Sequence, residues 1–189
     1  MNDLRQLLRS ETHASHARVD ELYSQLDLTT PGDYRRFLTC NLMALLSFDL
    51  TGTPFIVSDY VREACALLLS DLKMLGGETN AIAVHRPKTL SPAPIAALYV
   101  LGGASFGQRI LQMRWQASKD IQVQSARNYL RSQGAQALWK AFLHAGENSR
   151  LSDGEKCVIV NSANRMFDVY AEAFLVTRDT PQPSVTLAS

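Results

Sequence analysis

The sequence predicts an all-α fold in a single domain. Apolar residues recur at the three- and four-residue spacing of amphipathic helices, and alternation of apolar and polar residues is nowhere long enough to indicate a sheet. The 189 residues, 46% hydrophobic and 20% charged, suffice for one substantial core, and no linker or repeat divides them. We expect residues 1–178 to form this domain and residues 179–189 to be a disordered tail.

Three helices are predicted in the N-terminal half. The first, over about 2–26, carries its leucines, a valine and a tyrosine on one face. Thr30 and Pro31 form a cap and a first-turn proline, which open the second helix. A third helix is predicted over 60–75. Glycine, proline and polar residues then indicate a long connection over 76–92.

The C-terminal half is predicted to be helical as well. A long apolar helix begins at a proline and covers about 94–117. Two shorter helices follow, over 121–132 and 135–145. Ser152 and Glu155 have the spacing of a capping box, which opens a final helix with an aromatic stripe.

The first helix offers a metal ligand, His16. Arg9 lies seven residues earlier on nearly the same face, and on one continuous helix the two would be about 10 Å apart along the axis. Asp20 lies one turn beyond His16, where a carboxylate orients a ligating imidazole. His13 is the alternative ligand, about 60° away from the face of Arg9.

The long apolar helix contains Gly102, Gly103 and Gly107, each of which costs about 1 kcal/mol in a helix interior. Gly103 and Gly107 are one turn apart and share a face, with Arg114 seven residues further on. This bare stripe permits a kink and the close approach of a flat group. Tight packing against another helix explains the spacing equally well. With His16, however, the stripe predicts a haem pocket between two helices.

Other candidates carry less weight. Phe167 and Tyr170 could wall a pocket, although most aromatic stripes are core, and Lys140 could reach an anion, although most lysines are solvated. The Gly-x-x-x-Gly run lacks the strand and the lysine of a nucleotide site.

Composition excludes several classes of protein. The net charge of +1 and the lack of a basic or acidic block argue against a nucleic-acid partner. No run approaches the roughly 18 apolar residues of a membrane span, and the N-terminus does not resemble a signal peptide. Three widely spaced cysteines are typical of reduced thiols, so we expect a cytoplasmic protein that does not bind membranes.

Several runs of the chain resemble the haem oxygenase family, especially its small bacterial branch found beside bacteriophytochromes. Residues 8–20, LRSETHASHARVD, are similar to the proximal helix, and the match places the axial ligand at His16 rather than His13. Residues 99–107, YVLGGASFG, are similar to the distal helix, whose two glycines lie over the haem. Shorter stretches also match: Tyr34–Leu38, Trp139–Phe142 and Phe167 with Tyr170.

The resemblance implies a haem-oxygenase-like multihelical fold, with haem as both cofactor and substrate. It implies oxidative cleavage to biliverdin, carbon monoxide and iron, with His16 on the iron and Gly103 and Gly107 steering the bound oxygen. It also implies an electron-donating reductase of the ferredoxin or flavoprotein type, and either iron release or a bilin-receiving photoreceptor as the destination of the product. Arg9 and Arg114, with Lys140 in reserve, are the expected propionate partners.

The chain departs from the family pattern at one point. The family carries an acid just after or just before the first distal glycine, where this chain has Ala104 and Gly102. A water network would then depend on backbone carbonyls, Ser105 or Gln108. Two alternatives to the enzyme follow: a catalytically inactive haem-binding or haem-sensing protein, and a haem-free regulatory module on the same scaffold.

Overall fold

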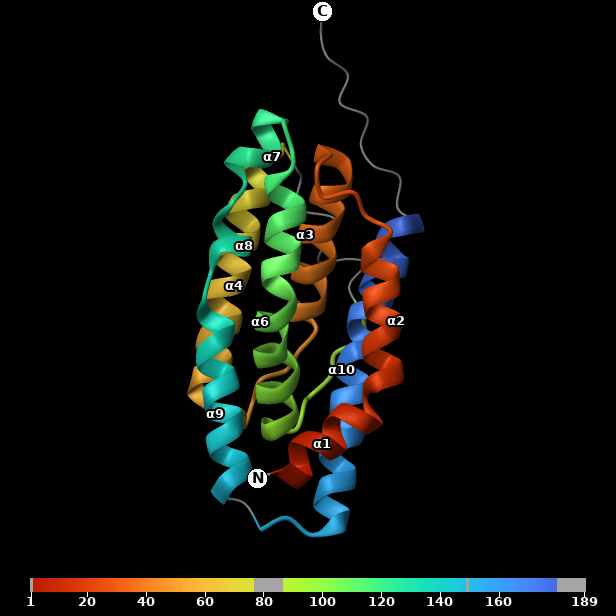
Figure 1. Cartoon of the computed structure of the whole chain (residues 1–189), viewed down its shortest axis with the longest axis vertical. Helices are drawn as coiled ribbons and strands as arrows, with labels where there is room; N and C mark the ends of the chain where they lie inside the picture. Colours follow the sequence, from red (N-terminus) through yellow and green to blue (C-terminus); the bar gives the residue numbers. More distant parts are fainter. Residues whose placement is uncertain (1, 77–86, 149, 180–189) are drawn as a thin grey trace, which may run out of the picture.

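The computed structural model describes residues 2–76, 87–148 and 150–179, and this part of the chain is all-helical, as predicted (Figure 1). It contains no strand, and one isolated parallel bridge joins Phe48 to Leu90. Residue 179 still belongs to the last helix, and the rest of the predicted tail lies outside the described residues. In chain order the helices are α1 (Asn2–Glu11), α2 (His13–Ser24), α3 (Pro31–Leu46), α4 (Phe55–Met74), α6 (Pro94–Gln116), α7 (Ile121–Ser125), α8 (Asn128–Arg131), α9 (Gly134–Asn148) and α10 (Asp153–Asp179).

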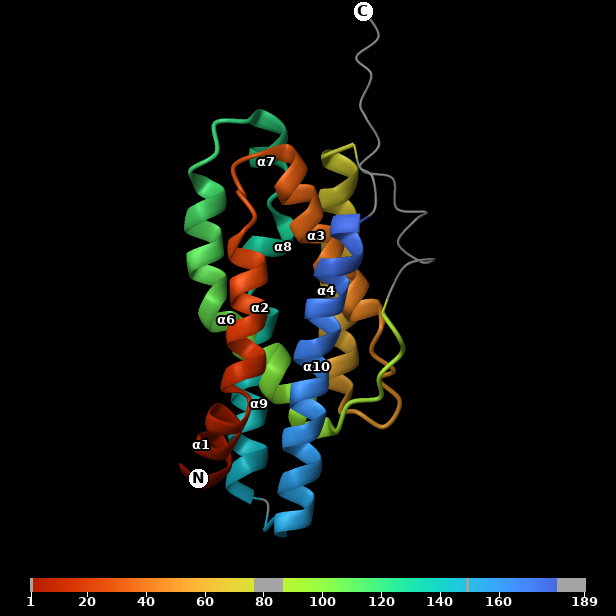
Figure 2. The same cartoon turned by 90° about the vertical axis from the view of Figure 1, so that its right-hand side faces the viewer.

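The long helices run side by side along an elongated bundle (Figure 1, Figure 2). Helix α10 packs on α2, α3 and α6, while α3 packs on α4 and α6 packs on α9. The bulkiest side chains of the core are fully buried between these layers: Trp115, Tyr34, Phe142 and Phe174. Burial of apolar surface at roughly 25 cal/mol per Å² therefore holds the bundle together.

Local signals determine where two helices begin. The Thr30 hydroxyl accepts the backbone N–H of Asp33 at 3.4 Å, and Pro31 occupies the first turn of α3, as predicted. Before α10, the N–H of Ser152 donates to the Glu155 carboxylate at 2.8 Å and the N–H of Glu155 donates to the Ser152 hydroxyl at 3.3 Å. This reciprocal pair confirms the predicted capping box.

Two predicted boundaries are wrong. Helix α4 begins at Phe55, directly after Pro54, rather than at residue 60. Phe55 is 75% accessible, but Val57 in the same turn is fully buried and continues the buried face of Val61 and Ala64, so the helical periodicity reaches this turn and the predicted start was set too late. The single helix predicted over 121–132 is two short helices, because Ala126 between them has a ψ of 76°, outside the helical region.

The predicted continuous helix over 2–26 changes direction at Thr12, which separates α1 from α2 (Figure 1). Thr12 is buried, its ψ is 1°, and its hydroxyl donates to the carbonyl oxygen of Leu8 at 2.6 Å. Such a bond to the preceding turn bends helices. The bend lets α1 bury Leu4 and Leu8 while α2 continues along α10.

Candidate functional site

A cavity of about 770 Å³ is lined by residues of α1, α2, α3, α4, α6, α8, α9 and α10. Its volume lies within the range of about 300–1,000 Å³ of small-molecule sites. The lining brings together every residue predicted to bind or contact haem except Lys140, which is exposed on α9 outside the cavity. The selected residues in the lining are Arg9, His16, Asp20, Gly103, Gly107, Arg114, Phe167 and Tyr170.

The His16 imidazole is held by two neighbours at the mouth of this cavity. Its Nδ1 lies 3.0 Å from a carboxylate oxygen of Asp20, as the spacing predicts. The ring meets Phe167 of α10 edge-on, with 5.3 Å between the ring centroids. A proton on Nδ1 shared with Asp20 leaves Nε2 as the free metal ligand. The His16 side chain is 58% accessible, and His13 does not line the cavity.

The bend at Thr12 corrects the predicted relation of Arg9 to His16. The two residues lie on different helices, so the distance along one straight axis does not apply. Both nevertheless line the cavity. Arg5, one turn before Arg9, also lines it and lies 5.5 Å from the ring centroid of Trp139. Arg5 was missed, although its four-residue spacing from Arg9 is visible in the sequence.

The three glycines of α6 fall into two groups. A Cβ on Gly102 would lie 2.6 Å from the backbone nitrogen of Trp139, so this glycine allows α6 to pack closely on α9. A Cβ on Gly103 or Gly107 would meet nothing within 4 Å, and both residues line the cavity. The packing explanation therefore holds for Gly102 alone. Figure 2 shows α6 changing direction about midway along its length.

Arg114 lines the cavity but already has protein partners. Its Nη2 donates to the carbonyl oxygen of Leu26 and to that of Ser24, the latter at 3.4 Å. These bonds tie the end of α6 to the end of α2. By contrast, the Arg9 guanidinium is exposed and makes no hydrogen bond or ion pair with any described residue. Arg9 and Arg5 are therefore better placed than Arg114 to bind an anionic group.

The two polar side chains expected to organise water on α6 are already engaged. The Ser105 hydroxyl donates to the carbonyl oxygen of Gly102 at 2.8 Å. The Gln108 amide donates to the carbonyl oxygen of Leu130 at 3.2 Å and to that of Ser132. Asp20 supplies the one carboxylate in the described lining, and this carboxylate is paired with the His16 imidazole.

The inner end of the cavity carries four tyrosines, of which only Tyr170 was predicted from the sequence. We name Tyr23, Tyr60, Tyr129 and Tyr170 the tyrosine cluster; they come from α2, α4, α8 and α10. The Tyr129 hydroxyl donates to Asn41 Oδ1 at 3.3 Å, and the Tyr23 hydroxyl donates to the carbonyl oxygen of Tyr170 at 3.5 Å. The cluster puts neutral polar groups deep inside a largely apolar site.

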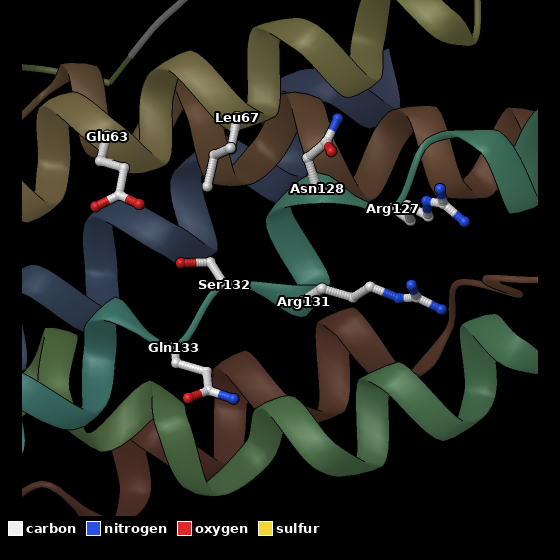
Figure 3. Close-up of a pocket in the computed structure, with 7 residues that line it drawn as sticks. All are labelled: Glu63, Leu67, Arg127, Asn128, Arg131, Ser132 and Gln133. Atoms are coloured by element: carbon white, nitrogen blue, oxygen red, sulfur yellow. The ribbon is translucent and has the colours of Figure 1, made fainter.

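A second, shallower pocket of about 290 Å³ lies between α4 and α8 (Figure 3). Its Asn128 side chain donates to the buried carboxylate of Asp71 at 2.8 Å, and the backbone N–H groups of Asn128 and Tyr129 donate to the same carboxylate. Burial raises the pKa of Asp71, and these donors oppose the rise. The contacts attach α8 to α4 and thereby place Tyr129 at the main cavity.

No protein-family model, curated protein or solved structure matches this chain. Within the described ranges, no three histidine, cysteine, aspartate or glutamate side chains are grouped to hold a metal ion. None of the described helices is long and apolar enough to cross a membrane. A haem iron needs only one axial side chain from the protein, which His16 can supply.

Proposed function

We propose that this protein is a haem oxygenase, which cleaves haem to biliverdin, carbon monoxide and iron with dioxygen and external electrons. One observation carries the proposal: His16, backed by Asp20, shares a single cavity with the bare backbone of Gly103 and Gly107. An oriented imidazole on one helix and open glycines on another are what a flat iron macrocycle requires between two helices.

The cavity offers residues suited to the iron, the ring and a propionate of haem. When bound, haem supplies the iron that activates dioxygen and the ring that is cleaved. His16 Nε2 would bind the iron, with Asp20 holding the imidazole in the ligating tautomer. Gly103 and Gly107, with open space where a Cβ would lie, would let the ring come close to the α6 backbone. Arg9, at the solvated mouth, binds a propionate, since a charged group is costly to bury unpaired.

The reaction needs an electron donor and a destination for its product. The electrons come from a reductase of the ferredoxin or flavoprotein type, because the activation of dioxygen consumes electrons. The product supplies a bilin-receiving photoreceptor or releases iron. Neither nucleic acid nor a membrane is needed for the reaction, which would take place in the cytoplasm.

A second candidate is a haem-binding or haem-sensing protein that does not cleave its ligand. It is favoured by the lack of a carboxylate in the described lining apart from Asp20, which is paired with His16. Assistance by a general acid is typically worth 10²–10⁴-fold, so its loss can leave binding intact while turnover stops.

Turnover of the haem complex separates these two functions. The complex is supplied with ferredoxin, its reductase and oxygen, and catalase removes free peroxide that would attack haem non-specifically. We expect the main haem absorption band to decay while bilin absorption appears in the red. A haem complex that keeps its spectrum through this treatment would leave the binding protein as the function.

A further inference from the structure

The pocket between α4 and α8 has a basic end and an acidic end (Figure 3). Arg127 and Arg131 lie at one end of it, and Glu63 lies at the other. Ser132 is the one residue that lines both this pocket and the main cavity. The pocket of about 290 Å³ is therefore a separate site, which no step of the proposed function uses.

The two guanidinium groups of the basic end have no acidic partner in the described chain. Arg127 and Arg131 are one helical turn apart, since the backbone N–H of Arg131 donates to the carbonyl oxygen of Arg127 at 3.3 Å. Neither side chain makes a hydrogen bond or an ion pair with a described residue. Like charges one turn apart repel each other. A bound anion removes this repulsion and accepts hydrogen bonds from both guanidiniums.

Contacts with the core hold the basic end in place. The guanidinium carbon of Arg131 lies 5.7 Å from the centroid of the Trp115 ring, and Trp115 is fully buried. At this distance the cation is attracted to the face of the ring. Helix α8 is itself attached to α4, because the Asp71 carboxylate accepts the side-chain amide of Asn128 at 2.8 Å. A site held in this way loses less conformational entropy when a ligand binds.

The residues around the basic end supply hydrogen-bond acceptors. The Glu63 carboxylate forms no ion pair with either arginine or with any other described residue. The amide nitrogen of Asn128 is used by Asp71, which leaves Oδ1 of Asn128 as an acceptor. A purely anionic ligand would leave the Glu63 carboxylate unpaired, whereas a ligand that also carries an ammonium group satisfies both ends of the pocket.

The charge of the basic end favours one kind of anionic group. A phosphate monoester carries a charge of about −1.5 to −2 at neutral pH and so balances two guanidiniums. A carboxylate has a single charge and balances one of them. Two arginines can also bind three phosphate oxygens through paired N–H groups.

We propose that this pocket binds a small aminoalkyl phosphate, with its phosphate monoester on Arg127 and Arg131 and its ammonium group on Glu63. The ligand binds without any covalent change. The site does not depend on haem, since its residues lie on the side of α8 that faces α4.

Isothermal titration calorimetry with two probes tests this proposal on the full chain without haem, in a buffer free of phosphate and sulfate. Inorganic phosphate tests the basic end alone, and O-phosphoethanolamine tests both ends. We expect one site per chain for each probe. O-phosphoethanolamine should bind about 3- to 5-fold more tightly than phosphate, because its ammonium group gains an exposed ion pair with Glu63.

Three variants locate the site. Arg127→Gln and Arg131→Gln should each weaken binding of both probes about 10-fold, because each removes charge-assisted hydrogen bonds. Glu63→Gln should still bind phosphate but should bind O-phosphoethanolamine no more tightly than phosphate. Arg109→Gln is the matched control, since Arg109 is an exposed arginine of α6 that lines neither pocket. It should bind both probes like the wild type.

Unchanged affinities in both variants of the basic end would overturn the proposal, as would an equal loss in Arg109→Gln, which would indicate attraction by net charge alone. A wild type that binds neither probe, or that binds the two equally, would also overturn it. Circular dichroism confirms that each variant is folded. None of these outcomes bears on the proposed function, because neither probe requires haem.

Discussion

The two ends of the cavity differ in chemistry and in how they are built. The mouth is charged and solvated, with Arg9, His16 and Asp20 on the first two helices. The inner end is neutral, and its tyrosine cluster and Asn41 come from five different helices. An ionic group can enter such a site only at the mouth, because burial of an unpaired charge costs far more than burial of a neutral hydroxyl that finds a partner.

The largest expected effect is a loss of stability at alkaline pH, which arises at the inner end of the cavity. Burial raises the pKa values of the tyrosine cluster in the folded protein, so the stability it contributes is complete below the unfolded pKa of about 10 and is lost as the pH rises toward about 12, the value for Tyr60. We expect phenolate absorption from these residues to appear together with loss of helical circular dichroism. Ionisation of all six tyrosines at pH 10 in a fully folded chain would contradict the neutral inner end.

Two glycines of α6 give the next comparison. Gly102→Ala forces a methyl group onto the Trp139 backbone, where a Cβ would lie 2.6 Å from nitrogen, and should lower the free energy of unfolding by about 3 kcal/mol. Gly103→Ala meets open space and should raise it by up to about 1 kcal/mol, because alanine favours helix. Urea denaturation measures both. Equal losses in the two variants would mean that both glycines are packing residues.

Two arginines of the lining should differ in a similar way. Arg114→Ala removes the bonds to the carbonyl oxygens of Ser24 and Leu26, and should cost about 2 kcal/mol of unfolding free energy. Arg9→Ala should change stability by less than about 0.5 kcal/mol, since Arg9 is exposed, and should weaken haem binding instead. Thermal unfolding and haem titration of both variants check this assignment. A stable Arg114→Ala protein with weakened haem binding would reverse it.

The contact between His16 and Asp20 could be predicted from the sequence because its signal is local. His16 and Asp20 are one turn apart, so helical geometry alone brings them together. Likewise the cap at Thr30 and the box at Ser152 are interactions within three residues, and both were confirmed. The bend at Thr12 was missed because it depends on how α1 packs, which its helical periodicity does not reveal.

Apart from Tyr170, the residues of the inner end could not be predicted, for a different reason. The contact of Tyr23 with Tyr170 joins residues far apart in the sequence, and Tyr129 reaches Asn41 from α8, which the buried carboxylate of Asp71 attaches to α4. Such contacts depend on the packing order of the helices. The periodic pattern identifies a tyrosine as buried or exposed, and cannot tell a cavity wall from a core position.

Haemin titration of three proteins tests the central claim most directly. The wild type should form a one-to-one complex with the absorption spectrum of histidine-ligated haem. His16→Ala should lose that spectrum, because it removes the imidazole that lines the cavity, whereas His13→Ala should keep it, because His13 lies outside the lining. A His13→Ala protein that loses the spectrum while His16→Ala keeps it, or a wild type that does not bind haem, would contradict the account.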